Sequence, residues 1–149
     1  MRFNFLLLLI TTLTAVALSQ EWKPHQVKIK LRNTEYYWAL DTVNNVILSL
    51  QGLNWTTVPF NPTSGSLSSG SISRFNGESV QSFGINNKLT LSKANSNDPK
   101  QCWHFNPDGL IQLCNVPNWA ATVVYRPVLT TVELRPINSG PQKWDIVKV

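Results

Sequence analysis

The strongest constraint on the fold of this chain is a tripeptide pattern, Gln-x-Trp, that occurs twice. The copies are Gln101-Cys102-Trp103 and Gln142-Lys143-Trp144, and they start 41 residues apart. Each copy closes a segment of short alternating apolar and polar residues. Repeats of about 40 residues are too small to bury their own apolar faces, so they predict one closed assembly around a shared core.

A third, degraded copy of the repeat unit lies upstream, where only the sequence of its turn is still similar. The segment Phe105-Asn106-Pro107, followed by Gly109, is echoed by Phe60-Asn61-Pro62, followed by Gly65. This alignment places Val58 where the two tryptophans stand. The chain therefore contains three units of about 40 residues, and their assembly should have approximate threefold symmetry.

Short alternating runs dominate the chain, and no segment of helical length shows a sustained 3.6-residue apolar period. The clearest run is Val27 to Arg32, which alternates apolar and basic residues without error. Turn signals rich in Asn, Gly and Pro separate the runs, and we count about twelve short strands, four in each unit. The other runs expected to form strands include residues 46–50, 89–91, 110–113, 121–125 and 132–134.

This pattern resembles the β-trefoil of the ricin-B lectin family. The resemblance rests on the two Gln-x-Trp tripeptides, on the turn Asn106-Pro107-Asp108-Gly109, and on Trp38-Ala39-Leu40-Asp41, which is similar to that family's Cys-Leu-Asp-Val segment. It covers nearly the whole chain after the first residues. It implies an all-β fold, a β-trefoil of three four-stranded units with pseudo-threefold symmetry, in which six strands close a barrel and six form a hairpin cap.

The first residues have the features of a targeting segment. Arg2 supplies a positive charge, residues 5–17 are mostly apolar, and Ala17-Leu18-Ser19 fits a small-x-small cleavage site. We therefore expect residues 1–19 to be a signal peptide and residues 20–149 to form one β-trefoil domain of a secreted, extracellular protein. The apolar stretch is short and contains threonines, which favours a cleaved signal over a membrane anchor, and no other segment is apolar enough to span a bilayer.

The charge of the chain is modest, with a formal net charge of +5 and 14% charged residues. This composition is not typical of a nucleic-acid binder, although a mild excess of Lys and Arg is compatible with an anionic glycan. Lys28, Lys30 and Arg32 alternate on one predicted strand and could bind sulfated or phosphorylated glycans. More often such a row is the solvated face of a strand.

The chain has two cysteines, Cys102 and Cys114, which in a secreted protein suggest one disulfide. If two antiparallel strands are joined by a turn centred on Asp108, Cys102 faces Cys114, and a bridge between adjacent strands is geometrically plausible. The alternative is a redox or catalytic thiol, which the absence of a nearby basic cluster disfavours.

No motif in the sequence indicates an enzyme. The two histidines, His25 and His104, lie far apart, and no cluster of His, Asp or Glu has the spacing of metal ligands. The chain contains no Gly-rich phosphate loop and no Gly-x-Ser-x-Gly motif. We therefore expect no catalytic activity, no cofactor and no metal.

The tryptophans divide into core residues and candidate platforms. Trp103 and Trp144 are expected in the core, because they close their units. Trp38 and Trp119 occupy equivalent places and suit either the core or an exposed platform. Trp55 lies in a polar stretch that is expected to form a loop, where its ring would suit stacking on a sugar; packing beside the loop is the equal alternative.

The resemblance also implies where sugar would bind. In the ricin-B family each unit uses an Asp from the second strand, an aromatic residue from the third, and an Asn or Gln before the final Trp. Only Asp41 keeps the aspartate, and the aromatic position falls on Ser49, Ser92 and Arg135. Unit one is therefore the least eroded, and we expect its carbohydrate-binding residues to be Asp41, Asn44, Asn45 and Trp55. The simpler alternative is that Asp41 caps its own turn.

One glycosylation sequon with an allowed middle residue occurs, Asn54-Trp55-Thr56. In a secreted loop such a tripeptide often carries a glycan, so Asn54 is the expected modification site. A glycan on Asn54 would argue against Trp55 as a binding platform.

These observations predict a secreted, non-catalytic, lectin-like protein whose partners are glycans or glycoproteins, with no nucleic-acid binding and no membrane insertion. The main alternative is a secreted β-trefoil protease inhibitor with a protease as its partner, which the loss of the family's sugar-contacting residues favours. A receptor-binding effector or toxin-like module is a third hypothesis, and the sequence offers no test of it.

Overall fold

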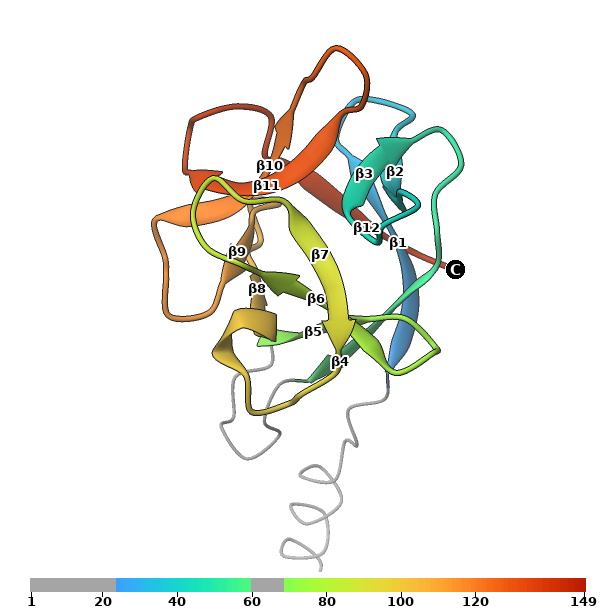
Figure 1. Ribbon diagram of the computed structural model, residues 1–149, viewed down its shortest axis with the longest axis vertical. Helices are drawn as coiled ribbons and strands as arrows, with labels where there is room; N and C mark the ends of the chain where they lie inside the picture. Colours follow the sequence, from blue (N-terminus) through green and yellow to red (C-terminus); the bar gives the residue numbers. More distant parts are fainter. Residues whose placement is uncertain (1–23, 60–68) are drawn as a thin grey trace, which may run out of the picture.

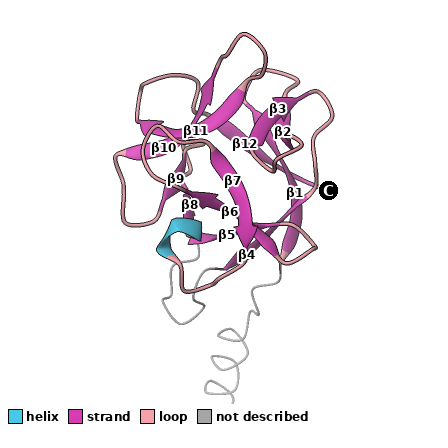
Figure 2. Cartoon of the chain, viewed as in Figure 1, coloured by secondary structure: helices cyan, strands magenta, loops and turns pink. Residues whose placement is uncertain are grey.

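Twelve strands run through residues 24–59 and 69–149, the part of the chain that the computed structural model describes (Figures 1 and 2). Within these ranges the helical structure is one 3-10 turn, η2, of Pro99–Gln101. The all-β prediction and the expected number of strands are confirmed. The expected signal peptide of residues 1–19 and the upstream turn at Phe60-Asn61-Pro62 lie outside the described residues.

The strands are short, as the spacing of the turn signals indicates. Their bounds are β1 His25–Leu31, β2 Tyr37–Leu40, β3 Val46–Ser49, β4 Trp55–Pro59, β5 Ser69–Ser73, β6 Glu78–Ser82, β7 Leu89–Lys93, β8 Trp103–Phe105, β9 Ile111–Leu113, β10 Trp119–Val124, β11 Thr131–Pro136 and β12 Trp144–Lys148.

Nine of these strands close a ring of antiparallel pairs. The ring runs from β1 through β4, β5, β8, β9, β10, β11, β3 and β2, and returns to β1. Three strands lie outside it: β12 pairs with β1, and the β6–β7 hairpin is attached through β5. Closure leaves no free sheet edge in the ring itself, which removes a route to aggregation.

The predicted β-trefoil of three four-stranded units with pseudo-threefold symmetry is wrong, because this pairing does not divide the strands into three equivalent sets. The β2–β3 and β10–β11 hairpins belong to the ring and pair with each other. The β6–β7 hairpin instead meets them through the isolated bridges Asn45–Thr90 and Lys88–Glu133. The sequence repeat marks equivalent buried side chains, whereas strand pairing depends on which backbones meet. The β6–β7 hairpin meets the other two through a few isolated backbone hydrogen bonds, from Leu91 to Asn44 and between Leu134 and the turn at Asn86 and Asn87.

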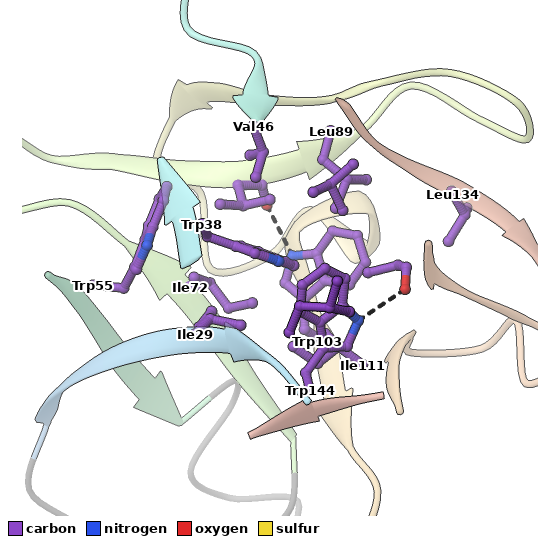
Figure 3. Close-up of a cluster of buried hydrophobic side chains, with 14 of the residues drawn as sticks. Ile29, Trp38, Val46, Trp55, Ile72, Leu89, Trp103, Ile111, Leu134 and Trp144 are labelled. Carbon is purple, nitrogen blue, oxygen red and sulfur yellow. Dashed lines mark hydrogen bonds between the residues drawn. The ribbon is translucent and has the colours of Figure 1, made fainter. Parts of the chain in front are cut away.

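The repeat nevertheless survives in the core (Figure 3). Trp103 Nε1 donates a hydrogen bond to the carbonyl of Val80, and Trp144 Nε1 donates one to the carbonyl of Ala121, each at 2.9 Å and 23 residues earlier. Both side chains are buried. Their prediction as core residues is confirmed, and backbone carbonyls satisfy the polar ends of both indoles.

The glutamines of the repeat hold the loops before the two tryptophans. Each side-chain amide donates to a backbone carbonyl at the end of the preceding strand and accepts the N–H of a residue in the loop. These partners are Lys93 and Asn95 for Gln101, and Pro136 and Asn138 for Gln142. The Gln-x-Trp pattern therefore fixes a loop through its glutamine and fills the core through its tryptophan. Both roles are local, which explains why the pattern can recur without repeating the strand pairing.

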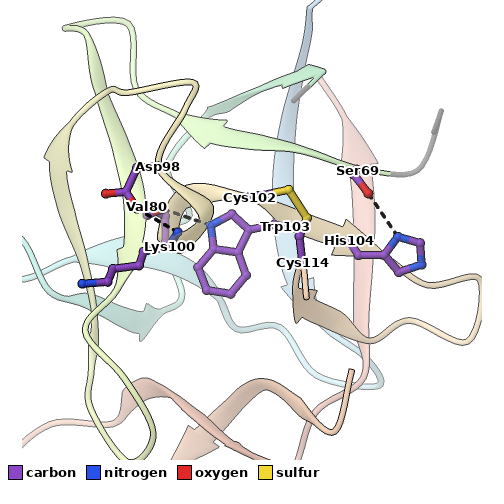
Figure 4. The surroundings of a disulfide bond; sticks show 8 residues. All are labelled: Ser69, Val80, Asp98, Lys100, Cys102, Trp103, His104 and Cys114. Carbon is purple, nitrogen blue, oxygen red and sulfur yellow. Dashed lines mark hydrogen bonds between the residues drawn. A yellow bond between two sulfur atoms is a disulfide. The ribbon is translucent and has the colours of Figure 1, made fainter. Parts of the chain in front are cut away.

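The predicted disulfide between Cys102 and Cys114 is confirmed (Figure 4), with the two Cα atoms 5.3 Å apart. The register of β8 and β9 pairs His104 with Gln112, as a turn centred on Asp108 requires. The bridge lies directly beside the core tryptophan Trp103, so it fastens β8 to β9 at the wall of the ring.

Candidate functional site

Three of the four expected sugar-binding residues of unit one, Asp41, Asn44 and Asn45, lie in the turn between β2 and β3. Asp41 Oδ1 accepts hydrogen bonds from the backbone N–H groups of Val43 at 3.0 Å and Asn45 at 2.8 Å, and Oδ2 accepts one from Asn45 Nδ2 at 2.7 Å. A carboxylate offers about four acceptor positions. The turn uses three of them, so this geometry supports the capping role of Asp41.

The charge of Asp41 is stabilised by the same contacts. Burial alone would raise the pKa of this carboxyl group. The hydrogen bonds from Asn45 and Val43, together with the positive charge of Lys88, outweigh burial and hold the pKa of Asp41 below its ordinary value. The carboxylate is therefore ionised at neutral pH, and the turn is held by charge-assisted hydrogen bonds.

The two asparagines tie this turn to the neighbouring hairpin. Asn44 has a φ of 64°, a left-handed conformation that Asn adopts more readily than most residues, and its carbonyl accepts the N–H of Leu91 at 2.9 Å. Asn45 Oδ1 accepts a hydrogen bond from Thr90 Oγ1 at 3.2 Å. The structure therefore brings Asp41, Asn44 and Asn45 together and fixes them against β7.

Trp55 does not belong to this group, and its prediction as a sugar-stacking platform is wrong. The side chain is fully buried and its ring meets the ring of Trp38 edge-on, with 6.0 Å between the centroids. Its polar neighbours suggested a loop, but the segment forms β4, in which successive side chains face opposite sides. The preceding residue, Asn54, is exposed, so the sequon asparagine is accessible.

Beside the Asp41 turn lies a pocket that the sequence analysis missed. It has a volume of about 380 Å³ and forms between the β6–β7 turn, β7, the β10–β11 loop and β11. We call it the Glu133 pocket, and its lining residues are Phe83, Asn86, Asn87, Lys88, Thr90, Arg126 and Glu133. Thr90 links it to the Asp41 turn through the hydrogen bond to Asn45.

Glu133 is the buried acid of this pocket. Its side chain is fully buried and accepts hydrogen bonds from Arg126 Nη2 at 2.5 Å, Arg135 Nη2 at 2.7 Å and Thr131 Oγ1 at 3.1 Å. Burial by itself raises the pKa of Glu133, but the hydrogen bonds from Arg126, Arg135 and Thr131 outweigh it, so this pKa lies below its ordinary value. Glu133 therefore stays charged and orients the two guanidinium groups.

Positive charge exceeds negative charge around the pocket. The pocket and its surroundings contain three cations and two anions, which gives a net charge of +1; these residues are Lys88, Arg126, Arg135, Glu133 and Asp41. The Arg126 side chain is 48% exposed, so part of its guanidinium group faces solvent while Nη2 holds Glu133. This arrangement can accept an anionic group at the pocket mouth.

The rim supplies an aromatic ring and an amide. Phe83 is 54% exposed on the β6–β7 turn. Asn86, with a φ of 64°, is exposed, and its side-chain amide forms no hydrogen bond with residues 24–59 or 69–149. Asn87 Nδ2 donates to the carbonyl of Phe83 at 3.2 Å, which fixes the turn. An aromatic face with convergent polar groups is the usual form of a small-ligand site.

One signal in the sequence could have located this pocket. The dipeptides Asn44-Asn45 and Asn86-Asn87 recur 42 residues apart, and the first asparagine of each has the same left-handed φ of 64°. Both turns also hydrogen-bond to the next hairpin through their backbones. The second copy therefore marks a turn equivalent to the Asp41 turn, with Phe83 beside it.

Other types of site are not formed by the described residues. Within residues 24–59 and 69–149, no group of three or more His, Cys, Asp or Glu could hold a metal ion. Across the same ranges no helix is long and apolar enough to cross a membrane. His104 lies on β8 with Nδ1 3.4 Å from Ser69 Oγ (Figure 4).

No protein-family model matches the chain, and no curated protein matches it. Several solved structures share its fold. The cytolethal distending toxin of Haemophilus ducreyi is 14% identical, with a TM-score of 0.65 over 83% of each chain. That of Actinobacillus actinomycetemcomitans is also 14% identical, with a TM-score of 0.65 over 83% of this chain and 90% of the other.

A lectin domain has the same fold. A mutant of the C-terminal domain of an earthworm lectin, in complex with 6'-sialyllactose, is 14% identical, with a TM-score of 0.57 over 84% of this chain and 99% of the other. At this level of identity the likeness shows the fold alone. The protein therefore belongs to a class of all-β folds that occurs in toxins and in at least one lectin.

Proposed function

We propose that the protein binds carbohydrate without catalysing a reaction, and that the Glu133 pocket is its binding site. The observation that carries this proposal is the convergence of an exposed ring, Phe83, an exposed amide, Asn86, and a half-exposed guanidinium group, Arg126, around one open pocket. Aromatic faces stack on sugar rings, and amides and charged groups form hydrogen bonds with sugar hydroxyl groups. The likeness to a lectin domain supports the proposal.

The charge balance favours a saccharide that carries a carboxylate. Lys88 and the exposed part of Arg126 would bind the carboxylate through charge-assisted hydrogen bonds, while Phe83 holds the apolar face of the ring. Asn45, held in place by Asp41, supports this site through its hydrogen bond with Thr90 of β7.

Titration calorimetry with two saccharides tests the proposal. Lactose and 6'-sialyllactose differ by one sugar residue that carries a carboxylate. The wild-type protein should bind 6'-sialyllactose at least about tenfold more tightly than lactose, because a tenfold ratio corresponds to about 1.4 kcal/mol, the scale of one charged contact. Equal affinity for both would contradict the preference for an acidic saccharide.

Variants locate the binding site. Phe83→Ala and Lys88→Gln should each weaken saccharide binding. Matched controls are Phe75→Ala, an exposed ring outside the pocket, and Lys93→Gln, an exposed lysine outside it. Equal losses in the variants and their controls would show that the pocket is not the site. If no glycan on an array binds the wild-type protein, the carbohydrate function is wrong, and a protease-inhibition panel run in parallel tests the inhibitor alternative.

We also propose that the protein is secreted, with residues 1–19 removed as a signal peptide, and that Asn54 is glycosylated. The disulfide supports an oxidising compartment, and the exposure of Asn54 supports its modification. Protein recovered from the medium of eukaryotic cells should begin at Gln20 and lose mass when N-glycans are removed. Thr56→Ala should abolish that loss, and recovery only from inside the cells would contradict secretion.

A further inference from the structure

A row of cations runs along the outward face of β1. Lys28 and Lys30 alternate with buried residues of β1, so their side chains face the same side, about 6.6–6.8 Å apart along the strand, and Arg32 follows in the turn directly after β1. β12 lies antiparallel beside β1 (Figure 1), and the carbonyl of its neighbour Lys143 accepts the N–H of Arg32 at 2.9 Å. Lys143 therefore extends the row at its far end.

Two of these cations already have acidic partners. Lys30 Nζ lies 3.1 Å from Glu35 Oε1, and Arg32 Nε lies 2.8 Å from Asp145 Oδ1. Both pairs are at least partly exposed, so water screens them and each is weak.

The other two cations keep their charge available. Lys28 and Lys143 form no ion pair with residues 24–59 or 69–149, so this face retains two positive charges. The ring of Tyr37, on β2, lies 5.9 Å from Lys28 Nζ and 5.6 Å from Lys30 Nζ. These cation–π contacts hold both ammonium groups at the surface.

The row ends in a pocket of about 410 Å³ between the turn after β1 and the β11–β12 loop. Arg32 and Lys143 line this pocket together with Asn33, Asn138 and Tyr125. The Tyr125 side chain is 69% exposed, so its ring is available for stacking beside two amides and two cations. We call the row and this pocket together the β1 face.

We propose that the β1 face binds a sulfated polysaccharide, with sulfates along the row and one sugar ring in the pocket against Tyr125. Sulfate esters pair directly with ammonium and guanidinium groups, and a linear ligand suits the period-two spacing of the cations. Single-stranded nucleic acid needs several exposed aromatic platforms, whereas among residues 24–59 and 69–149 the lining of this face offers one exposed ring, Tyr125, because two lysines already cover Tyr37. The proposal stands independently of the Glu133 pocket.

Salt elution from immobilised heparin and from desulfated heparin tests this site. The wild-type protein should be retained on heparin at low salt and should elute as the salt concentration rises, because screening weakens exposed charge contacts. Desulfated heparin lacks the sulfates that the cations bind and should not retain the protein. Lys28→Gln/Lys143→Gln should weaken binding about tenfold, as expected for two exposed charge contacts. The control Lys93→Gln/Lys100→Gln makes the same charge change on β7 and η2, outside the face, and should bind as the wild type does.

Further variants separate the alternatives. Tyr125→Ala should weaken heparin binding and Tyr125→Phe should not, and thermal melting checks that all variants are folded. Equal losses in the two double-lysine variants would mean that only net charge matters, which overturns the proposal. Equal competition by a single-stranded oligonucleotide would overturn it in favour of nucleic acid. Weaker 6'-sialyllactose binding by Lys28→Gln/Lys143→Gln would overturn the independence of the two sites, whereas unchanged binding supports it.

Discussion

Trp103 and Trp144 make the same hydrogen bond from equivalent positions, each to a backbone carbonyl 23 residues earlier at 2.9 Å. Trp38 is equally buried, and its ring meets that of Trp144 edge-on with 5.5 Å between the centroids, yet its Nε1 has no hydrogen-bond partner among the described residues. The core therefore contains buried indoles that donate a hydrogen bond and one, that of Trp38, that has no acceptor among the described residues, so the value of this bond can be measured.

This comparison gives a first prediction. Trp103→Phe and Trp38→Phe remove the same atoms, but only Trp103→Phe leaves a buried carbonyl, that of Val80, without its donor. We expect Trp103→Phe to lower the free energy of unfolding by about 1–1.5 kcal/mol more than Trp38→Phe, the net value of one buried hydrogen bond. Guanidinium unfolding of both variants measures the difference. A Trp38→Phe variant that is as unstable as Trp103→Phe would contradict it.

The disulfide gives a second prediction. Cys102 and Cys114 are 12 residues apart, so their bridge closes a short loop that stabilises the protein by about 2–3 kcal/mol in the chain-entropy model. The double variant Cys102→Ser/Cys114→Ser should lose that much unfolding free energy and still fold, because Trp103 keeps its place in the core. Unchanged near-ultraviolet circular dichroism would support this. Labelling of both cysteines in the native secreted protein would contradict the bridge.

Acid should destabilise the protein through Glu133. The folded pKa of this group lies below its unfolded value of about 4.3, so its stabilising effect is fully present above that pH and is lost as the pH falls through the folded pKa. Glu133→Gln should lower the free energy of unfolding at neutral pH by about 1–3 kcal/mol, because two half-exposed arginines lose their partner.

The same variant should show a smaller further loss of stability on acidification than the wild type. Unfolding curves from about pH 7 to pH 3 measure this loss. Glu35→Gln is the matched control, because Glu35 is 77% exposed and pairs with one lysine. If Glu35→Gln reduces the acid sensitivity as much as Glu133→Gln does, the buried cluster is not its cause.

Local features of the fold were predictable because they depend on residues close in sequence. Alternation along Val27 to Arg32 predicts a strand with one buried face, and the turn centred on Asp108 predicts the pairing of Cys102 with Cys114. The closure of the ring was not predictable in this way. The Gln-x-Trp repeat reports which side chains are buried, and two copies of it do not determine that β12 pairs with β1.

The candidate site was harder to predict than the fold. The polar neighbours of Trp55 predict an exposed loop, but the segment forms strand β4, in which the indole faces the core. The Glu133 pocket combines Phe83 of the β6–β7 hairpin with Arg126 and Glu133 of the β10–β11 hairpin, and the meeting of β7 with β11 brings them together. The recurrence of the Asn-Asn dipeptide marks the turn beside Phe83, but it indicates neither Arg126 nor Glu133.

The last prediction concerns the role of Asp41. In Asp41→Asn the side-chain oxygen can still accept the N–H groups of Val43 and Asn45, while the contact with Asn45 Nδ2 is lost. We therefore expect unfolding free energy to fall by about 1 kcal/mol and saccharide binding to stay unchanged. Asp41→Leu removes all three acceptor contacts and should be clearly less stable than Asp41→Asn.

Direct binding of sugar by the Asp41 carboxylate predicts the opposite result. Loss of the charge would then weaken saccharide binding by about 1.5–3 kcal/mol, at least tenfold, while the melting temperature holds. Calorimetric titration and thermal unfolding of the same Asp41→Asn preparation separate the two roles. Because the turn occupies three acceptor positions of this carboxylate, we expect the melting temperature to move and the affinity to hold; the reverse pattern would return Asp41 to the binding site.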